Sequence, residues 1–412
     1  MNDVRRVVAG RIVRGFADGF ISVLLAQYLT DLGFSPIQVG AIVTGTLLGS
    51  AALTLAFGIG ARRTTLGRLL VAACALMGLT GVGFAAITSF WPLLVVAVVG
   101  TLNPTAGDVS VFLPTEQAFI ADRVSGPART RSYAVYNVGG ALAGALGALV
   151  SALPERIARA GSWQLTSVER VGFALYALAA VAIFAMYRSI PGREVALSSG
   201  RGNGDGDEQH DRSLGASRRL VLGLAALFAL DSAGGGFVVT SLLVLWLHQR
   251  FDLSRGRTAG VFFAAGVLGA CSQLLAPVLA RRIGLVRTMV FTHLPANALL
   301  ALAAFAPNAG TAVALLLGRA LFSQMDVPAR QAFVMAIVPP PARAAASSIT
   351  NVPRSLASAT TPLLAGALLS HSDFGWPLLI AGVTKFTYDL LLLALHRDTP
   401  ESQPNRVGLP RA

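Results

Sequence analysis

The sequence predicts an all-α polytopic membrane protein whose twelve transmembrane helices form two six-helix bundles related by a pseudo-two-fold axis along the membrane normal. Three observations lead to this fold class: the apolar composition, a series of hydrophobic stretches and an internal repeat. Of the 412 residues, 54% are hydrophobic and only 13% are charged, whereas a soluble domain carries about 25% charged residues. The chain therefore has too little polar side-chain surface for a soluble fold.

Apolar stretches recur along the whole chain, and each is long enough to cross a bilayer as a helix, which takes about 20 residues. We expect spans at residues 7–30, 37–60, 69–88, 91–121, 132–153, 169–187, 220–247, 258–280, 288–306, 309–338, 345–369 and 377–395.

Arginine supplies nearly all of the basic side chains, and its distribution predicts the orientation. With the N-terminus inside, most arginines fall in the inner segments, and the outer loops hold Arg156, Arg159, Arg170, Arg250, Arg255 and Arg257. This positive-inside pattern predicts that both termini are cytoplasmic, in a cell membrane that we expect to be a bacterial inner membrane. The pattern also accounts for the net charge of +13, so we expect a lipid bilayer and no nucleic acid as partner.

A polar segment divides the chain into two halves. Residues 188–219 are rich in Gly, Ser and charged side chains, a composition typical of a flexible linker. The predicted organisation is a six-helix bundle over residues 1–187, a cytoplasmic linker over 188–219, a second bundle over 220–397 and a cytoplasmic tail over 398–412.

The two halves repeat each other in sequence. The segment LPTEQAF at 113–119 matches VPARQAF at 327–333, an offset of 214 residues (328 − 114). ARRTTLGR at 61–68 matches ARRIGLVR at 280–287, an offset of 219 (280 − 61). Two halves with the same orientation form a parallel repeat. The charge inverts between the copies, with Glu116 in the first and Arg330 in the second.

With these features the chain resembles the major facilitator superfamily of secondary transporters, in particular its twelve-helix drug/proton antiporters. The family carries a Gly-x-Leu-Ala-Asp-Arg-x-Gly-Arg type of signature in the inner loop after the second helix of each half. The inner-loop motif of this chain comprises Arg62, Arg63, Arg68, Arg281, Arg282, Gly284 and Arg287. Both copies depart from the family pattern, because arginine (Arg62 or Arg281) replaces the aspartate associated with locking the inner gate.

Ionisable residues within the spans carry the functional prediction, since a charge at the bilayer centre costs roughly 2.5–3.5 kcal/mol. Most lie on the first, fourth, seventh and tenth spans, which the resemblance implies line a central cavity. We assign the substrate and proton pathway to Asp18, Asp108, Asp231, Arg319 and Asp326. Asp108 and Asp18 are our first choices for the proton carrier. Arg319 and Arg354 could neutralise these acids or bind an anionic substrate.

A second group of charges is predicted to form an inner gate. Glu116 and Arg330 occupy matching positions at similar shallow depth, so we expect them to pair across the axis, joined by Arg14. The alternative is a static pair that only orients the two halves. Arg14 could also pair with Asp18 four residues on. Lys385 and Asp389 have the same spacing, and we expect a structural intrahelical pair there.

Small residues mark the span at 132–153, where Gly140 and Gly144 form a GxxxG step that allows close helix contact. The resembling antiporters carry a Gly-Pro-rich signature in this span. This chain has the glycines but lacks the proline, so the resemblance favours export only mildly.

The predicted function is that of a secondary transporter, not an enzyme, which moves a small solute by alternating access and works as a monomer. Proton-coupled efflux is the first hypothesis, and proton-coupled uptake of an anionic solute is the alternative, supported by the membrane arginines. A non-transporting receptor or a membrane enzyme is a third reading. We expect no metal or other cofactor, with the proton as coupling ion, because no metal-ligand or catalytic motif is present.

Overall fold

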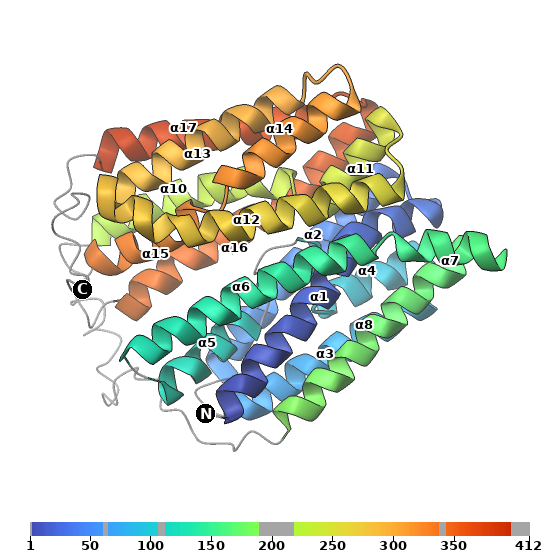
Figure 1. Cartoon of the computed structure of the whole chain (residues 1–412), viewed down its shortest axis with the longest axis horizontal. Helices are drawn as coiled ribbons and strands as arrows, with labels where there is room; N and C mark the ends of the chain where they lie inside the picture. The colour runs from blue at the N-terminus through green and yellow to red at the C-terminus, as the bar shows by residue number, and fades with distance from the viewer. Residues whose placement is uncertain are drawn as a thin grey trace. The chain divides into compact units, whose positions relative to one another are not determined.

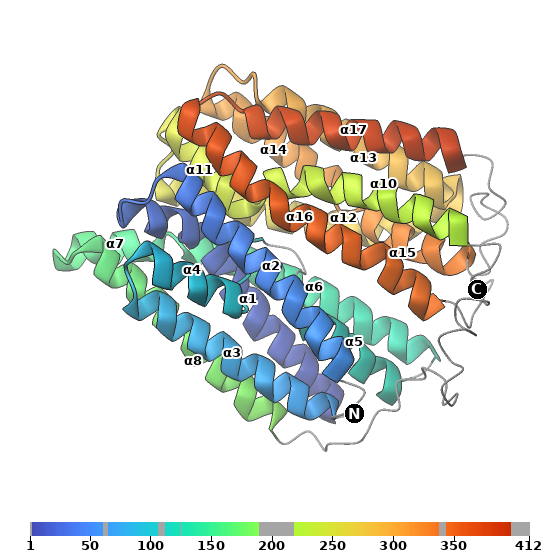
Figure 2. The ribbon, with the colours of Figure 1, turned by 180° about the vertical axis from the view of Figure 1, so that it is seen from behind.

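The computed structural model describes residues 2–60, 65–105, 112–124, 126–188, 218–337 and 343–396, and within these ranges all regular structure is α-helical (Figures 1 and 2). The first half contains α1 (Asn2–Asp31), α2 (Pro36–Gly60), α3 (Leu66–Ala86), α4 (Phe90–Val99), α5 (Phe112–Arg123), α6 (Gly126–Val150), α7 (Leu153–Gly161) and α8 (Leu165–Tyr187). The second contains α10 (Arg218–Phe237), α11 (Thr240–Phe251), α12 (Arg255–Ile283), α13 (Leu285–Ala303), α14 (Ala309–Phe322), α15 (Asp326–Ile337), α16 (Arg343–His371) and α17 (Trp376–His396).

Each of the twelve predicted spans corresponds to one or two of these helices. Eight helices are long and apolar enough to cross a membrane on length and composition alone, and they lie in α2, α3, α6 with α7, α8, α10, α12, α13 and α17. The other predicted spans are α1, α4 with α5, α14 with α15, and α16. Of these, α4, α5, α14 and α15 are too short to cross a membrane singly, and α1 and α16 are long but more polar. Several of the ionisable residues singled out from the sequence lie on these helices.

Three spans predicted as continuous helices are interrupted. The span at 91–121 breaks after α4, the span at 220–247 breaks between α10 and α11, and the span at 309–338 breaks between α14 and α15. Pro114 and Pro328 lie in the first turn of α5 and α15, where a missing N–H leaves no helical bond unmade. Hydropathy averaged over a whole span does not locate such breaks, because each of the three spans is apolar overall.

The helix boundaries reproduce the sequence repeat. α12, α13 and α14 begin 219 residues after α2, α3 and α4 (255 − 36, 285 − 66 and 309 − 90). α15 begins and ends 214 residues after α5 (326 − 112 and 337 − 123). The two halves are therefore copies of one helical arrangement, including the break before α5 and α15.

The helices group into two compact units. Unit 1 holds the described residues of Met1–Leu197, Val238–Val267 and Pro362–Phe374, and unit 2 holds those of Ser198–Phe237, Leu268–Thr361 and Gly375–Ala412. Unit 1 thus combines the first-half helices with α11, the start of α12 and the end of α16. Residues 189–217 of the predicted linker, the predicted tail, Asp108, Arg62 and Arg63 lie outside the described residues.

Glycines bring α1 and α6 of unit 1 into backbone contact. A Cβ atom added at Gly19 would lie 2.0 Å from the carbonyl oxygen of Gly144, and one at Gly147 would lie 2.0 Å from that of Phe16. A Cβ at Gly15 would meet the carbonyl oxygen of Gly140 at 2.5 Å. The close contact predicted for the GxxxG step is therefore present, and its partner is α1.

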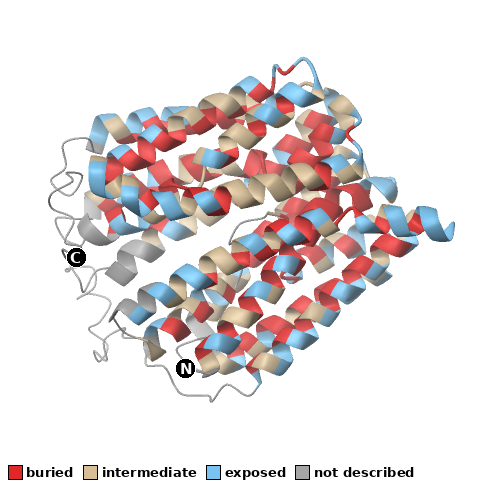
Figure 3. Cartoon of the chain, in the orientation of Figure 1, coloured by how far each residue is buried: buried red, intermediate tan, exposed pale blue. Residues whose placement is uncertain are grey.

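Exposed residues lie along the outer faces of many helices (Figure 3), and many of them are large apolar side chains, as expected for contact with lipid. On α8, Val171, Leu175, Leu178 and Val181 are each more than half exposed. In unit 2 a buried cluster that includes Leu224, Phe228, Met289, Phe333 and Tyr388 packs α10, α13, α15 and α17 together. Charged side chains such as Arg14, Glu116 and Asp389 are buried as well, which is rare in a soluble protein.

The contact between α1 and α6 leads to a stability prediction. Gly147→Ala should lower the apparent melting temperature of the detergent-purified protein by several degrees, because overpacking against backbone costs about 1–3 kcal/mol. Gly223→Ala on α10 is the matched control, since no atom lies within 4 Å of its added Cβ. It should leave the melting temperature unchanged or raise it, because alanine is the better helix former. Equal effects of the two substitutions would contradict the packing seen here.

Candidate functional site

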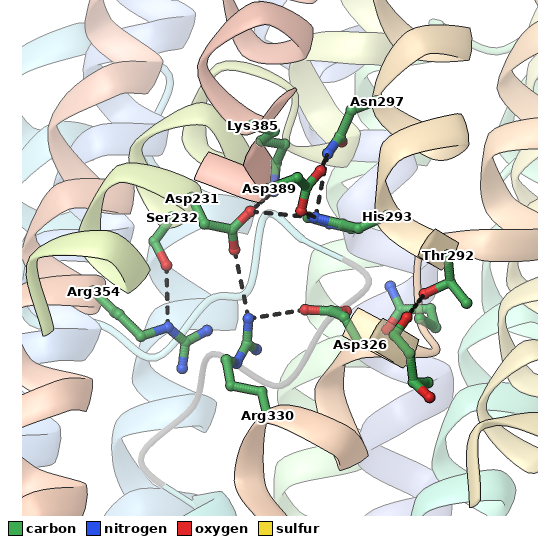
Figure 4. Close-up of polar contacts among 12 residues, drawn as sticks. Asp231, Ser232, Thr292, His293, Asn297, Asp326, Arg330, Arg354, Lys385 and Asp389 are labelled. Atoms are coloured by element: carbon green, nitrogen blue, oxygen red, sulfur yellow. Dashed lines mark hydrogen bonds and ion pairs between the residues drawn. The ribbon is translucent and has the colours of Figure 1, made fainter. Parts of the chain in front are cut away.

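Unit 2 encloses a group of charged and polar side chains contributed by α10 and α13 to α17 (Figure 4). This charge cluster consists of Asp231, Ser232, His293, Asn297, Arg319, Asp326, Arg330, Arg354, Lys385 and Asp389. All of them are buried except Arg319 and Arg354, which are partly buried. The structure therefore brings together three predicted pathway residues (Asp231, Arg319 and Asp326) and one predicted gate residue, Arg330.

Asp231 is the centre of the charge cluster. Its Oδ1 lies 2.6 Å from Lys385 Nζ, and its Oδ2 lies 3.5 Å from Arg330 Nη1. Arg330 Nη1 also donates to Asp326 Oδ2 at 3.0 Å. A charge removed from water needs such partners, because the free-energy cost of desolvation is offset only by well-oriented opposite charges and additional hydrogen bonds. These contacts tie α10, α15 and α17 together by charge.

The intrahelical pair expected between Lys385 and Asp389 is not the arrangement found. Lys385 reaches across to Asp231 on α10, while Asp389 faces α13. Gly234 makes this possible, because a Cβ there would lie 2.8 Å from Lys385 Cγ. The glycines of α10 were a signal in the sequence, but only the crossing of α10 and α17 shows which side chain they accommodate.

Asp389 forms a buried polar pair with His293, which sequence reasoning missed. His293 Nδ1 lies 3.0 Å from Asp389 Oδ1, and Asn297 Nδ2 donates to Asp389 Oδ2 at 2.8 Å. His293 Nδ1 is also 3.9 Å from Asp231 Oδ1. Through this contact the pair is linked to the ion pairs around Asp231.

Two arginines of the charge cluster have no carboxylate within ion-pair distance among the described residues. Arg354 donates from Nε to Ser232 Oγ at 3.2 Å and from Nη1 to Asn351 Oδ1 at 3.0 Å. Arg319 Nε is buried without a hydrogen-bond partner in the described part of the chain. Asp231 acts on both guanidinium groups only at longer range.

In unit 1 the predicted gate residues Arg14 and Glu116 form a buried bidentate pair. Arg14 Nη1 lies 2.5 Å from Glu116 Oε1, and Nη2 lies 2.9 Å from Oε2. The hydroxyls of Tyr136 and Tyr187 donate to the same carboxylate at 2.5 and 2.6 Å. The Arg14 guanidinium lies 4.4 Å above the ring of Phe112. Glu116 is thus held by four donors, an arrangement that offsets the desolvation of its charge.

The structure gives a reason for the sign inversion between the repeats. Glu116 on α5 pairs with Arg14 on α1, and Arg330 on α15 pairs with Asp231 on α10. α1 and α10 are the first helices of the two halves. In each half an ion pair joins the first helix to α5 or α15, and the two ion pairs have opposite polarity. Because both members change sign, the attraction persists within each half. A direct pair between Glu116 and Arg330 stays a prediction.

The remaining predicted residues lie elsewhere. Asp18 on α1 is buried in unit 1, with the Tyr176 hydroxyl 3.5 Å from Oδ1. Arg68, Arg281, Arg282 and Arg287 of the inner-loop motif are exposed at helix ends. Gly284 has a φ of 89° directly before α13, a conformation that favours glycine and explains this motif position.

A third charged group in unit 1 is formed around Arg255, which was predicted from the sequence to lie in an outer loop. Arg255, at the start of α12, forms ion pairs with Asp31 at the end of α1 and with Glu169 on α8. Glu169 is fully buried, and its Oε2 has no hydrogen-bond partner in the described residues. One arginine thus serves two carboxylates and joins second-half residues to first-half helices.

Neighbouring contacts in unit 1 make the same connection. Ser241 Oγ on α11 donates to the carbonyl oxygen of Ser22 at 2.8 Å, and the backbone N–H of Leu363 donates to Thr44 Oγ1 at 2.9 Å. Gly40 and Gly366 meet so closely that a Cβ at either would lie 3.0 Å from the Cα of the other. We call this set of contacts the latch: Arg255 with Asp31 and Glu169, Ser241 with Ser22, Leu363 with Thr44, and Gly366 with Gly40.

The buried pair of unit 1 leads to a double-mutant prediction. Glu116→Gln alone should destabilise the protein strongly, because removing one partner leaves the Arg14 charge buried, a cost of about 3–5 kcal/mol. The double variant Arg14→Gln/Glu116→Gln should lose less than the sum of the two single variants, measured by thermal unfolding in detergent. Additive effects would show that the two side chains do not interact.

Comparisons with known proteins agree with this architecture. The sequence model of the Major Facilitator Superfamily matches residues 7–324 and 294–411. The uncharacterized membrane protein YJR124C of Saccharomyces cerevisiae is 23% identical over 427 residues, which cover 95% of this chain and 94% of the yeast protein.

Two solved structures share the fold. A variant of the nucleoside transporter NupG has a TM-score of 0.75 at 11% identity, over 95% of this chain and 99% of that chain. The D-xylose-proton symporter has a TM-score of 0.75 at 15% identity, over 94% of this chain and 96% of that chain. Together with the family match, the twelve spans and the duplicated helices, these likenesses confirm the predicted fold class. The chain belongs to the major facilitator superfamily, which places it among secondary transporters of the membrane and not among enzymes.

Proposed function

We propose that this transporter couples the movement of a small solute to protons, and that the Asp389–His293 pair carries the coupling proton. The observation behind the proposal is the geometry of that pair, with 3.0 Å between His293 Nδ1 and Asp389 Oδ1 in a buried position. Histidine is the side chain whose charge changes near neutral pH. A carboxylate beside it can share, accept or release a single proton.

The contacts around Asp231 provide a route from that proton to the helices. His293 lies between Asp389 and Asp231, and Asp231 is bound to Lys385 and Arg330. A change of charge on His293 therefore changes the electrostatic balance at Asp231. This would strengthen or weaken the ion pairs that hold α10, α15 and α17, which is how a local protonation can bias one conformation over another.

The sequence prediction of export rested on the glycines of α6. In the structure Gly140, Gly144 and Gly147 serve the packing of α6 against α1, so they carry no argument about the direction of transport. The arginines without carboxylate partners instead favour the alternative, uptake of an anionic solute with protons. The D-xylose-proton symporter offers a precedent for proton symport within this fold.

Several finer assignments stay predictions. They are the resemblance to drug/proton antiporters, the monomeric state, the cytoplasmic placement of both termini and the bacterial inner membrane. The yeast relative shows that related chains also occur in a eukaryote.

The proton assignment can be tested in proteoliposomes, after a ligand-induced thermal-shift screen of organic acids, nucleosides and pentoses has supplied a transported solute. Asp389→Asn and His293→Gln should abolish accumulation driven by an imposed pH gradient, because neither retains the proton-carrying pair. Both should retain counterflow exchange, which needs no net proton movement.

Asp252→Asn is the matched control, since its side chain is 98% exposed at the end of α11; it should accumulate solute like the unmodified protein. Gradient-driven accumulation that survives in both cluster variants would exclude this pair as the proton carrier.

Alternating access requires the latch of unit 1 to open, which gives a second test. In a Cys74→Ala/Cys271→Ala background, the double variant Thr44→Cys/Leu363→Cys should form a disulfide under oxidation, because the Leu363 N–H and Thr44 Oγ1 are in hydrogen-bond contact. Transport should stop on oxidation and return after reduction, whereas either single cysteine should have no effect. Unchanged transport in the cross-linked protein would show that α2 and α16 need not separate.

A further inference from the structure

The charge cluster of unit 2 contains more positive than negative charge. Its carboxylates are Asp231, Asp326 and Asp389, whereas its permanent cations are Arg319, Arg330, Arg354 and Lys385. Every carboxylate has a basic partner within ion-pair distance, but Arg319 and Arg354 have no carboxylate partner among the described residues. Burying an unpaired charge is costly, so the cluster is one negative charge short of balance.

The donors of Arg354 are arranged to receive that negative charge. Its Nε and Nη1 bond to Ser232 and Asn351, and Nη2 has no acceptor among the described residues. The Ser232 oxygen accepts from Arg354, which leaves the hydroxyl hydrogen able to donate to a ligand. In Figure 4 the guanidinium groups of Arg354 and Arg330 extend toward each other below Asp231, and Arg330 acts on Arg354 as a neighbouring positive charge. Two neighbouring guanidinium groups, one of which has no carboxylate partner among the described residues, are suited to an anion.

We infer that the transported solute is a small organic anion, whose carboxylate or similar acidic group binds Arg354 Nη2 and the Ser232 hydroxyl within the charge cluster. Arg330 adds positive charge beside this position. A planar guanidinium matches a carboxylate in shape and donor direction, and such charge-assisted hydrogen bonds are the stronger ones. This inference rests on the proposed transport function and names the substrate class for it.

The same arrangement sets the sign of coupling between anion and proton. The charged and titratable groups around His293 are Asp389, Lys385 and Tyr388 on α17, Asp231 on α10 and Asp326 on α15. Arg330 on α15 and Arg319 on α14 in turn act on Asp231. Adding a proton to the His293–Asp389 pair makes the cluster more positive, which strengthens anion binding. Because coupling between two ligands is reciprocal, the bound anion also favours the proton. Proton and anion therefore bind together, which is symport.

The inference is tested by ligand-induced thermal shift of the full-length purified protein at pH 6 and pH 8. The probes are benzoate, succinate, L-lactate and L-glutamate, with benzamide, adenosine and D-xylose as uncharged comparisons and inorganic phosphate and sulfate as inorganic anions. At least one organic anion should stabilise the protein, and the uncharged compounds should not. The affinity for that anion should be higher at pH 6 than at pH 8.

Variants locate the site. Arg354→Gln should weaken anion binding by about tenfold or more, because a hydrogen bond to a charged group is lost. Ser232→Ala should weaken it to a smaller degree, and Arg354→Lys should recover part of the affinity. Arg257→Gln, an exposed arginine at the start of α12, is the matched control and should bind like the unmodified protein. If Arg354→Gln does not fold, Ser232→Ala and Arg354→Lys decide the question.

Three results would overturn the inference: stabilisation by uncharged probes alone, no stabilisation by any organic anion, or anion binding unaffected by the substitutions at Arg354 and Ser232. An anion affinity that falls at the lower pH would overturn the symport. Proton-coupled transport of an uncharged solute would leave the proposed function intact while removing the anion assignment. Anion transport that does not depend on a pH gradient would support the anion assignment and remove the proposed proton coupling.

Discussion

Charge burial in membrane-spanning helices is the constraint on which the arrangement of this protein depends. Burial removes a carboxylate or guanidinium from bulk water, so a buried one needs partners contributed by neighbouring helices. Asp231 meets this need through Lys385 and Arg330, and Glu116 meets it through Arg14 and two tyrosines. These contacts specify how the helices that carry the buried charges pack inside each unit.

The same constraint explains how the duplicated halves diverged. A single change of sign at Glu116 or Arg330 would leave one buried charge facing another of its own kind. The structure instead has a reversed partner on the first helix of each half, Arg14 on α1 and Asp231 on α10. The inversion of charge is thus compensated within each half. Residues around one ion pair could therefore change during divergence without affecting the ion pair of the other half.

The spans, the repeat and the close glycine contact of α6 could be predicted from the sequence, because hydropathy and residue size are properties of a single helix and can be read along it. The pairing of side chains between helices could not be predicted in this way. Lys385 and Asp389 are four residues apart, yet they face α10 and α13 because of helix rotation and crossing. His293 was overlooked for the same reason, since a lone histidine in an apolar span acquires chemical meaning only beside Asp389. The breaks before α5 and α15 depend on local backbone geometry that composition does not encode.

The two units also differ in what their charges leave available. The Glu116 carboxylate of unit 1 accepts two hydrogen bonds from Arg14 and one from each tyrosine, so its charge is satisfied without a ligand. In unit 2 the additional carboxylates Asp326 and Asp389 are matched by Arg330 and His293, and the guanidinium groups of Arg319 and Arg354 are left over. The two halves have similar helical arrangements. The ion pair of the first half is satisfied without a ligand, whereas the additional cations of the second half leave a positive charge that a bound anion would balance. Selectivity for charge can therefore reside in the second half of the chain, while the first half supplies a firmly held scaffold.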